Sequence, residues 1–293
     1  MKTKLQDLIK LFRIKQWIKN GFILFPLIFS GQLSKTNLLA ESWITFLGFC
    51  LISSSMYILN DFIDARNDRI HPQKSQRPLA QKKFNTATVI FLTLSTMTLG
   101  LMISLKADAM ILFLAVFYVI IHAIYNLCAR KIVILDVIFI AVGFQIRIWA
   151  GSFAAGVLPS VWLQLCVFLL ALFLGFTKRR HEIASLRNHA PEHRSVLAHY
   201  TTYLLDQIII ICSTLTIVFY GLYAISPEIM ARLGSHNLIY STGFVIYGIF
   251  RYLYLVHVKK LGDDPGEVMF SDKPLMINIF LWVLYIVVLL YFQ

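Results

Sequence analysis

Acidic residues are rare in this sequence, which has 15 Asp and Glu against 27 Lys and Arg. Charged residues of both signs make up only 14% of the 293 positions, whereas ordinary globular proteins have about 25%. Hydrophobic residues reach 58%, and the mean hydropathy is +0.71. So little charge excludes a water-soluble domain of this length and predicts that the lipid bilayer is the solvent.

Cysteine is also scarce, and several catalytic signatures are missing. The four cysteines lie in or beside apolar runs without CxxC spacing, which excludes a zinc knuckle and a disulfide framework. The sequence has no nucleotide P-loop, nucleophile elbow, HExxH or Rossmann fingerprint. The sequence therefore does not indicate any of the enzyme classes that these four motifs define.

Long apolar stretches, in contrast, are abundant. A helix needs roughly 20 apolar residues to cross a bilayer, and its backbone amides must be satisfied within the segment. We therefore expect an all-α polytopic membrane protein with about nine transmembrane helices, a single domain over residues 1–293, and an amphipathic N-terminal segment at 1–20. The first apolar segment is short and contains Pro26. The segments are 21–33, 38–59, 87–105, 109–125, 132–155, 161–176, 203–225, 238–258 and 275–291.

Lys and Arg gather in alternate loops. The basic sets precede the first segment and follow the second, fourth, sixth and eighth, whereas the other loops contain only Lys35, Lys106 and Arg232. Cytoplasmic loops carry this excess of positive charge, so the N-terminus and the basic loops are predicted to be cytoplasmic, as in a bacterial inner membrane protein. The same distribution explains the net charge of +12 without nucleic acid as a partner.

The second apolar segment ends in a run of carboxylates, NDFIDARND. Asp61, Asp64 and Asp68 are three and four residues apart, so a helix places them on one face, with Asn60 beside them. Hard oxygen ligands of this kind suit Mg²⁺, which usually also binds substrate phosphates. We predict that Asn60, Asp61, Asp64 and Asp68 hold Mg²⁺ against a diphosphate. The alternative is a solvated acidic helix end with ordinary ion pairs.

Cations follow these carboxylates directly. His71, Lys74 and Arg77 recur at helix-turn spacing in the next segment, and Arg66 lies within the acidic run. Lys and Arg beside a metal-bound diphosphate would hold its remaining anionic groups. The alternative is that they are only the positive flank of a membrane span.

Further polar residues occur near or within the apolar segments. In the basic stretch around Trp17, a helix would place Lys15 and Lys19 on one face, as a lipid-surface anchor or as a site for an anionic headgroup. Asp136, Arg147 and Arg251 lie within apolar segments, and ionisable residues at membrane depth usually line a cavity. The basic run Lys178–Arg180 at the end of the sixth segment could bind phosphate, and the alternative is that it is a stop-transfer cluster. The remaining candidates for substrate binding are Asn20, Tyr125, Arg130, Asp136, Arg147, Lys178, Arg179, Glu182 and Arg251.

These motifs together resemble a known family. NDFIDARND resembles the first Asp-rich motif of the UbiA-type intramembrane prenyltransferases, whose fold encloses a central cavity open to the cytoplasmic face. FRIKQWIKN, DVIFIAVGFQIRIWAG and TKRRHE are similar to blocks of one branch, the polyprenyl-phosphate phosphoribosyltransferases. Aromatic prenyltransferases of the superfamily carry a second Asp-rich motif after the sixth helix. In this sequence Lys178, Arg179, Arg180, His181 and Glu182 occupy that place.

The resemblance implies Mg²⁺-dependent transfer of 5-phosphoribose from phosphoribosyl diphosphate (PRPP) to a polyprenyl phosphate, with release of diphosphate. In that reaction His71, Lys74 and Arg77 would bind donor phosphates. Lys15, Lys19, Arg147, Lys178, Arg179 and Arg251 would be candidates for the acceptor phosphate. The product would serve cell-envelope glycan precursors. Two alternatives stay open: prenyl transfer to an aromatic acceptor, and a transporter or lipid-binding protein using the same cavity.

Overall fold

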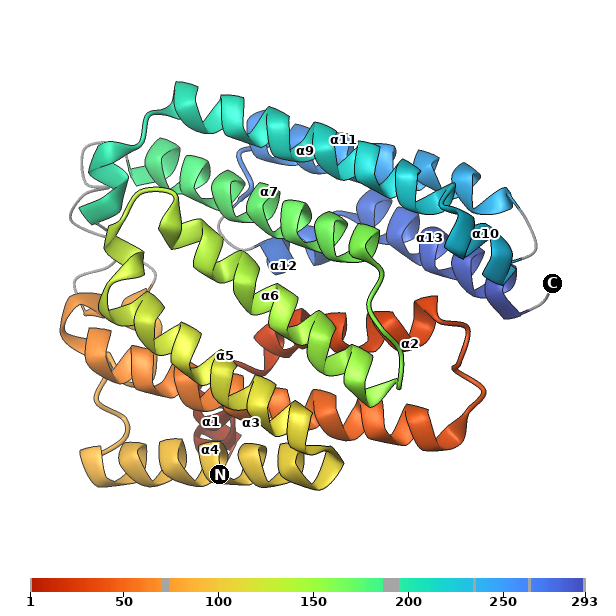
Figure 1. The fold of residues 1–293 in the computed structure, drawn as a ribbon. Helices are drawn as coiled ribbons and strands as arrows, with labels where there is room; N and C mark the ends of the chain where they lie inside the picture. Colours follow the sequence, from red (N-terminus) through yellow and green to blue (C-terminus); the bar gives the residue numbers. More distant parts are fainter. Residues whose placement is uncertain (1, 70–73, 187–194, 234–235, 263–264, 292–293) are drawn as a thin grey trace. The chain divides into compact units, whose positions relative to one another are not determined.

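The computed structural model is almost wholly helical (Figure 1), and it describes all residues except 1, 70–73, 187–194, 234–235, 263–264 and 292–293. Helices account for 85% of the described residues, and this part of the chain contains no strand, which confirms the all-α prediction. The elements are α1 Lys2–Leu11, η1 Ile14–Leu24, α2 Phe25–Phe29, α3 Thr36–Asp68, η2 Lys74–Gln76, α4 Thr86–Ala107, α5 Ala109–Leu127, η3 Ala129–Lys131, α6 Leu135–Ala154, α7 Val161–Leu186, η5 Ser195–His199, α9 Thr202–Ala224, α10 Pro227–Leu233, η6 Asn237–Ser241, α11 Thr242–His257, α12 Pro265–Ser271 and α13 Lys273–Tyr291, where η denotes a 3₁₀ helix.

The helices form two compact units. The first unit comprises residues 1–27, 32–127 and 146–157, and the second comprises 28–31, 128–145 and 158–293. Helix α6 begins in the second unit and ends in the first. Each unit thus draws on separate stretches of the chain, and the single domain expected from the sequence stays a prediction.

Eight helices in the described residues are long and apolar enough to cross a membrane, so the protein is an integral membrane protein. Their apolar composition is that of segments whose side chains face lipid. The count is one fewer than the nine expected. The spans are Thr36–Arg66, Thr86–Ala107, Ala109–Lys131, Leu135–Ala154, Val161–Ser185, Thr202–Ala224, Asn237–His257 and Lys273–Tyr291.

The difference lies in the first expected segment, 21–33. Instead of one α-helix, the chain there forms the end of η1 and the short helix α2. A 3₁₀ helix rises about 2.0 Å per residue, so the 11 residues of η1 and the 5 of α2 extend roughly 30 Å together. A ninth crossing in this segment stays a prediction from the alternation of basic loops.

The 3₁₀ geometry of η1 also corrects the expectation for Lys15 and Lys19. Residues of a 3₁₀ helix advance by 120°, so positions three apart share a face and positions four apart do not. Lys15 and Lys19 therefore point in different directions. The shared face is that of Trp17 and Asn20, which donate hydrogen bonds to Ser54 (2.9 Å) and Ser53 (3.1 Å) of α3. Through these bonds η1 lies along α3.

Small residues allow close helix packing in the first unit. Helices α3 and α4 lie side by side (Figure 1) and meet at Gly48 and Gly100. A Cβ on Gly100 would lie 2.9 Å from the carbonyl oxygen of Gly48, closer than real contacts allow. Helices in lipid associate largely through such close packing, because lipid tails are as apolar as leucine.

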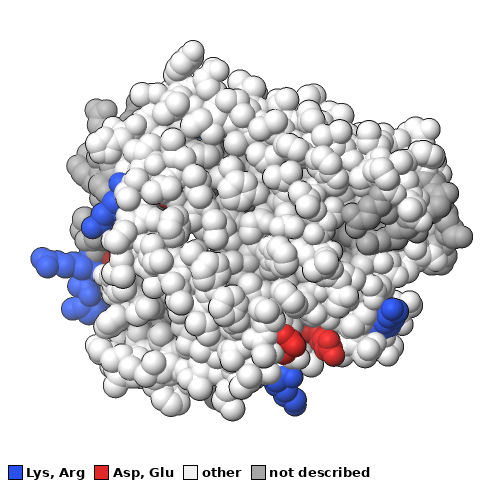
Figure 2. Space-filling view, viewed as in Figure 1, with Lys and Arg blue, Asp and Glu red and all other residues white. Residues whose placement is uncertain are grey.

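The second unit has its own apolar core. Phe173 and Phe176 of α7, Leu205 of α9, Tyr252 of α11 and Leu275 of α13 are buried in it. Many other large apolar side chains are exposed. The face drawn in Figure 2 is almost free of charged side chains, which gather at its margins. Such a surface is suited to lipid.

We expect Gly151→Ala to destabilise the first unit. A Cβ at this position of α6 would lie 1.9 Å from the carbonyl oxygen of Ile23, so η1 would have to move. Thermal unfolding in detergent should show a clearly lower Tm. The matched control is Gly221→Ala in α9, where nothing lies within 4 Å of the added Cβ. Alanine is favoured over glycine in a helix by about 1 kcal/mol, so Gly221→Ala should not lower the Tm. An equal loss of Tm in both variants would contradict the close packing of Gly151 against Ile23.

Candidate functional site

The predicted carboxylates lie at the end of α3. The helix continues without a break to Asp68, so Asp61, Asp64 and Asp68 share one face as the sequence spacing predicted. Asp61 and Asp68 are buried, with 3% and 4% of their surfaces exposed, and Asp64 is half-buried. We call Asn60, Asp61, Asp64 and Asp68 the carboxylate cluster.

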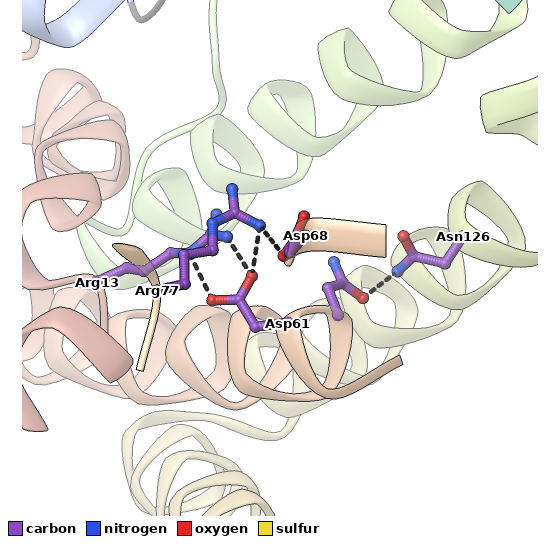
Figure 3. Close-up of polar contacts among 6 residues, drawn as sticks. Arg13, Asp61, Asp68, Arg77 and Asn126 are labelled. Carbon is purple, nitrogen blue, oxygen red and sulfur yellow. Dashed lines mark hydrogen bonds and ion pairs between the residues drawn. The ribbon is translucent and has the colours of Figure 1, made fainter. Parts of the chain in front are cut away.

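Two arginines pair with Asp61 and Asp68 of this cluster (Figure 3). Arg77 Nη1 donates to Asp61 Oδ1 at 3.0 Å and to Asp68 Oδ2 at 2.7 Å, so one cationic atom joins both carboxylates. Arg13 contacts both oxygens of Asp61, with its Nε 3.3 Å from Oδ2 and its Nη2 bonded to Oδ1. Buried carboxylates need such partners, because an unpaired buried charge is very costly.

Local structure brings both arginines to α3. Arg13 separates α1 from η1 in a left-handed conformation (φ 49°), and its guanidinium lies 4.9 Å above the ring of Tyr57. Arg77 follows η2, and Leu79, close behind it, is buried against Leu11 and other apolar residues. The carboxylate cluster is thus enclosed by two segments that are distant from it in sequence.

A neutral pair extends the cluster towards α5. Asn126 Nδ2 donates to Asn60 Oδ1 at 2.7 Å (Figure 3). This bond fixes the Asn60 side chain and ties the end of α5 to α3. Because Asn60 precedes Asp61 directly, the bond also stabilises the helical turn that carries the carboxylates.

The donor set of the cluster fits a divalent cation such as Mg²⁺. Its ligands are hard oxygens, and Asp61 and Asp68 already converge on one positively charged atom, Arg77 Nη1. In the arrangement observed, no group of three or more His, Cys, Asp or Glu side chains among the described residues is gathered tightly enough to bind a metal. The arginines therefore provide the positive charge between these carboxylates.

Two of the predicted residues, Asn20 and Arg147, meet Tyr118 deeper along α3. Arg147 of α6 donates from Nε to Asn20 Oδ1 and from Nη2 to Tyr118 Oη, both at 2.7 Å. The guanidinium also lies 4.8 Å from the centre of the Tyr118 ring. All three residues are at most 4% exposed. We call Asn20, Tyr118 and Arg147 the Arg147 cluster.

The second unit holds a buried ion-pair network. Arg179 of α7 donates to Asp136 Oδ2 at 2.6 Å and to Glu182 Oε2 at 3.0 Å. Tyr200 donates to Asp136 Oδ1 at 2.7 Å and accepts the Ile134 N–H at 2.6 Å. Burial, and next the hydrogen bond to Asp136, raises the pKa of Tyr200, so the phenol keeps its proton at neutral pH.

Carboxylates also pair with other cations that the sequence suggested for phosphate binding. Arg180 is bonded to Asp206 of α9, and Arg251 of α11 donates to both oxygens of Asp272, at 3.1 and 2.8 Å. The hydrogen bond from Arg251 is the main cause that lowers the pKa of Asp272. A phosphate that reached Arg179 or Arg251 would therefore have to compete with an existing carboxylate.

The predicted site residues fall into both units. His71 lies outside the described residues. The signal for Arg13 was its place in the basic stretch before Trp17, whereas nothing in the sequence pointed to Tyr118, Asn126 or Tyr200. The first unit contains Lys15, Lys19, Asn20, Asn60, Asp61, Asp64, Arg66, Asp68, Lys74, Arg77, Tyr125 and Arg147, and the second contains Arg130, Asp136, Lys178, Arg179, Glu182 and Arg251.

We expect Asp136→Asn to be far more damaging than Asp206→Asn. The first substitution leaves Arg179, 2% exposed in its side chain, without its buried partner, which typically costs about 3–5 kcal/mol. The Arg180–Asp206 pair is 20% and 32% exposed, and pairs open to water contribute about 0–1 kcal/mol. Thermal unfolding of the two variants in detergent measures the difference. Equal Tm values would contradict a structural role for the buried pair.

Comparisons with known proteins place these features in one family. The profile of the UbiA prenyltransferase family matches residues 23–273. A decaprenyl-phosphate phosphoribosyltransferase of Mycolicibacterium smegmatis is 28% identical, with 100% of this chain and 95% of the relative covered. The enzyme of the same name from Corynebacterium glutamicum is also 28% identical, over 99% of this chain and 88% of the relative.

The fold has a solved counterpart. A UbiA homologue from Archaeoglobus fulgidus, solved with GPP and Mg²⁺, superposes with a TM-score of 0.69. The superposition covers 97% of this chain and 99% of that one, at 16% sequence identity. The family profile spans most of the chain, including the carboxylate cluster, Tyr118 and Arg147, and the ion-pair network around Asp136. The chain belongs to the UbiA prenyltransferase family.

Proposed function

We propose that this protein transfers 5-phosphoribose from PRPP to a polyprenyl phosphate and releases diphosphate. The observation that carries the proposal is the convergence of Asp61 and Asp68 on the guanidinium of Arg77. This arrangement supplies both halves of a diphosphate site, namely oxygen ligands for a cation and arginine donors for phosphate oxygens. Full-length similarity to proteins named decaprenyl-phosphate phosphoribosyltransferase supports the choice of substrates.

The carboxylate cluster would hold Mg²⁺. Bound there, the ion would offset the negative charge that develops on the departing diphosphate, a contribution worth several kcal/mol. Asn60, Asp61, Asp64 and Asp68 supply only oxygen ligands, which matches the preference of this ion. The solved homologue bound to GPP and Mg²⁺ is consistent with a divalent ion in this fold.

The donor would then bind to the arginines that the cation displaces from the carboxylates. Arg13 and Arg77 are bonded to Asp61 and Asp68, and when a cation takes over these carboxylates, both guanidinium groups can turn to phosphate oxygens. The planar fork of arginine matches phosphate in a bidentate manner. We assign Lys74 and His71 to the same donor phosphates, with Arg66 as an additional candidate.

The chemical step needs no strong base. The acceptor phosphate is already an anion near neutral pH, so its oxygen can attack C1 of ribose as the bond from C1 to the diphosphate oxygen breaks. The electron pair of that bond leaves with the diphosphate. Lys15, Lys19, Arg147, Lys178, Arg179 and Arg251 are proposed to hold the acceptor phosphate, and Tyr125, Arg130, Asp136 and Glu182 to orient substrate groups.

The basic loops set the orientation that we propose. With the N-terminus and the carboxylate cluster on the cytoplasmic side of a bacterial inner membrane, the water-soluble donor reaches the site from the cytoplasm while the lipid acceptor stays in the bilayer. The product would be a lipid-linked sugar phosphate for cell-envelope glycan synthesis.

One competing activity follows from the solved relatives, which bind prenyl diphosphates. In that case the carboxylate cluster would hold a prenyl diphosphate, and an aromatic compound would accept the prenyl chain. Purified protein with Mg²⁺ and either substrate pair separates the two activities. Labelled lipid from PRPP and polyprenyl phosphate supports our proposal. Prenylated aromatic product without phosphoribosyl transfer would overturn it.

We expect Asp61→Asn to lower kcat for phosphoribosyl transfer at least 100-fold, because the neutral amide can no longer balance a cation. Losses of this size are typical when one electrostatic group is removed from an active site. The matched control is Asp7→Asn, which makes the same change in a residue paired with Lys83 and should retain activity. Undiminished turnover in a folded Asp61→Asn variant would remove the carboxylate cluster from the mechanism.

We also expect donor binding to depend on Mg²⁺. Isothermal calorimetry of the wild-type protein in detergent should detect PRPP binding with Mg²⁺ and at least tenfold weaker binding in EDTA, because the carboxylates repel the diphosphate unless a cation screens them. The Asp7→Asn protein should keep this difference. Equal affinity in the two buffers would contradict a metal-mediated donor site.

A further inference from the structure

Asn60 is the member of the carboxylate cluster that carries an amide instead of a carboxylate. Only the Oδ1 of an amide can bind a cation, because its NH₂ group donates hydrogen bonds and offers no lone pair. A carboxylate presents an oxygen whichever way it turns. The group that fixes the orientation of the Asn60 amide therefore decides whether this position can serve as a metal ligand.

That orientation is fixed from α5. Asn126 Nδ2 donates to Asn60 Oδ1 at 2.7 Å (Figure 3), across 66 positions of the sequence. Both side chains are half-buried. If the Asn60 amide turned over, its NH₂ group would face the NH₂ group of Asn126 and the bond would be lost. The amide oxygen has two lone pairs, so it can accept this bond and bind a cation at the same time.

Asn126 is itself held in place by the packing of α5 against α3. Tyr118, about two turns earlier in α5, is completely buried and packs against Phe49 of α3, with ring centres 5.6 Å apart. Helix α5 therefore contacts α3 at two heights, through this aromatic pair and through the amide pair. A metal ligand is held precisely only when its own support is rigid.

The bond from Asn126 differs in charge from the bonds that hold Asp61 and Asp68. Arg13 and Arg77 are cations, so a divalent cation that binds these carboxylates repels them. Asn126 is neutral and has no such repulsion. The amide pair can therefore persist when the cation binds, whereas the arginine pairs have to break.

We propose that Asn126 is a positioning residue for the divalent cation. It holds Asn60 in the orientation in which the side-chain oxygen, and not the NH₂ group, serves as a ligand. This inference rests on the proposed function and adds to it a residue that acts through a ligand. Partners that orient metal ligands typically contribute about 10–100-fold to metal affinity.

The test is the Mg²⁺ concentration that half-saturates PRPP binding, which we call the Mg²⁺ midpoint. Calorimetry without an acceptor measures it in the absence of turnover. Asn126→Leu removes both polar atoms at similar size and should raise the Mg²⁺ midpoint at least tenfold. Asn126→Ala should act in the same way and takes its place if the leucine variant cannot be purified. An unchanged midpoint in the folded variant would overturn the proposal.

A second background separates orientation from general structural support. In Asn60→Asp both terminal atoms of the side chain are oxygens, so rotation no longer removes a ligand. Asn126→Leu should therefore raise the Mg²⁺ midpoint much less in this background than in the wild-type protein. An equal rise in both backgrounds would overturn the positioning role, because Asn126 would then act independently of the Asn60 amide.

Asn278→Leu is a matched control for the loss of an amide bond between helices. Asn278 Nδ2 donates to the carbonyl oxygen of Phe244 at 2.9 Å in the second unit, and its side chain is half-buried like that of Asn126. The substitution should lower the Tm and leave the Mg²⁺ midpoint unchanged. A midpoint raised as much as in Asn126→Leu would overturn the specific role of Asn126.

The same measurements distinguish failure of this inference from failure of the proposed function. If wild-type protein requires Mg²⁺ for PRPP binding and Asn126→Leu shifts nothing, only the inference fails. If wild-type protein binds GPP with Mg²⁺ but does not bind PRPP, the proposed activity fails, and midpoints measured with GPP decide the inference. If neither ligand needs Mg²⁺, both fail.

Discussion

Repulsion among carboxylates on one helix face is the constraint on which the first unit depends. Asp61 and Asp68 are buried at the end of α3, and they are held together there by positive charge from Arg13 and Arg77. Those two arginines come from segments on either side of α3 in the sequence. The need to bring them to the carboxylates therefore positions both the N-terminal segment and the stretch after η2.

The two units handle buried charge differently. In the second unit, Arg179 and Asp136 are enclosed together and supported by Tyr200 and Glu182, so this network is largely complete in itself. In the first unit, Arg147 is held by an amide and a phenol. In both units the buried guanidinium is held by hydrogen bonds, because a buried charge without such partners is very costly.

Much of the fold and part of the site could be predicted from the sequence. Long apolar runs and the spacing of Asp61, Asp64 and Asp68 depend only on local helix geometry, so both predictions correspond to the structure. The partners of Asn60 and Arg147 could not be predicted, because Asn126 and Tyr118 reach them through tertiary packing. The orientation of Lys15 relative to Lys19 was wrong for a local reason, since η1 is a 3₁₀ helix.

The same helix has a consequence for how this chain can vary. Arg13 and Asn20 are attached to different levels of α3, and the residues between them set both their separation and their relative rotation. Adding or deleting one residue there would turn Asn20 through a third of a circle while Arg13 kept its contact. This stretch is therefore expected to tolerate insertions and deletions much less readily than substitutions.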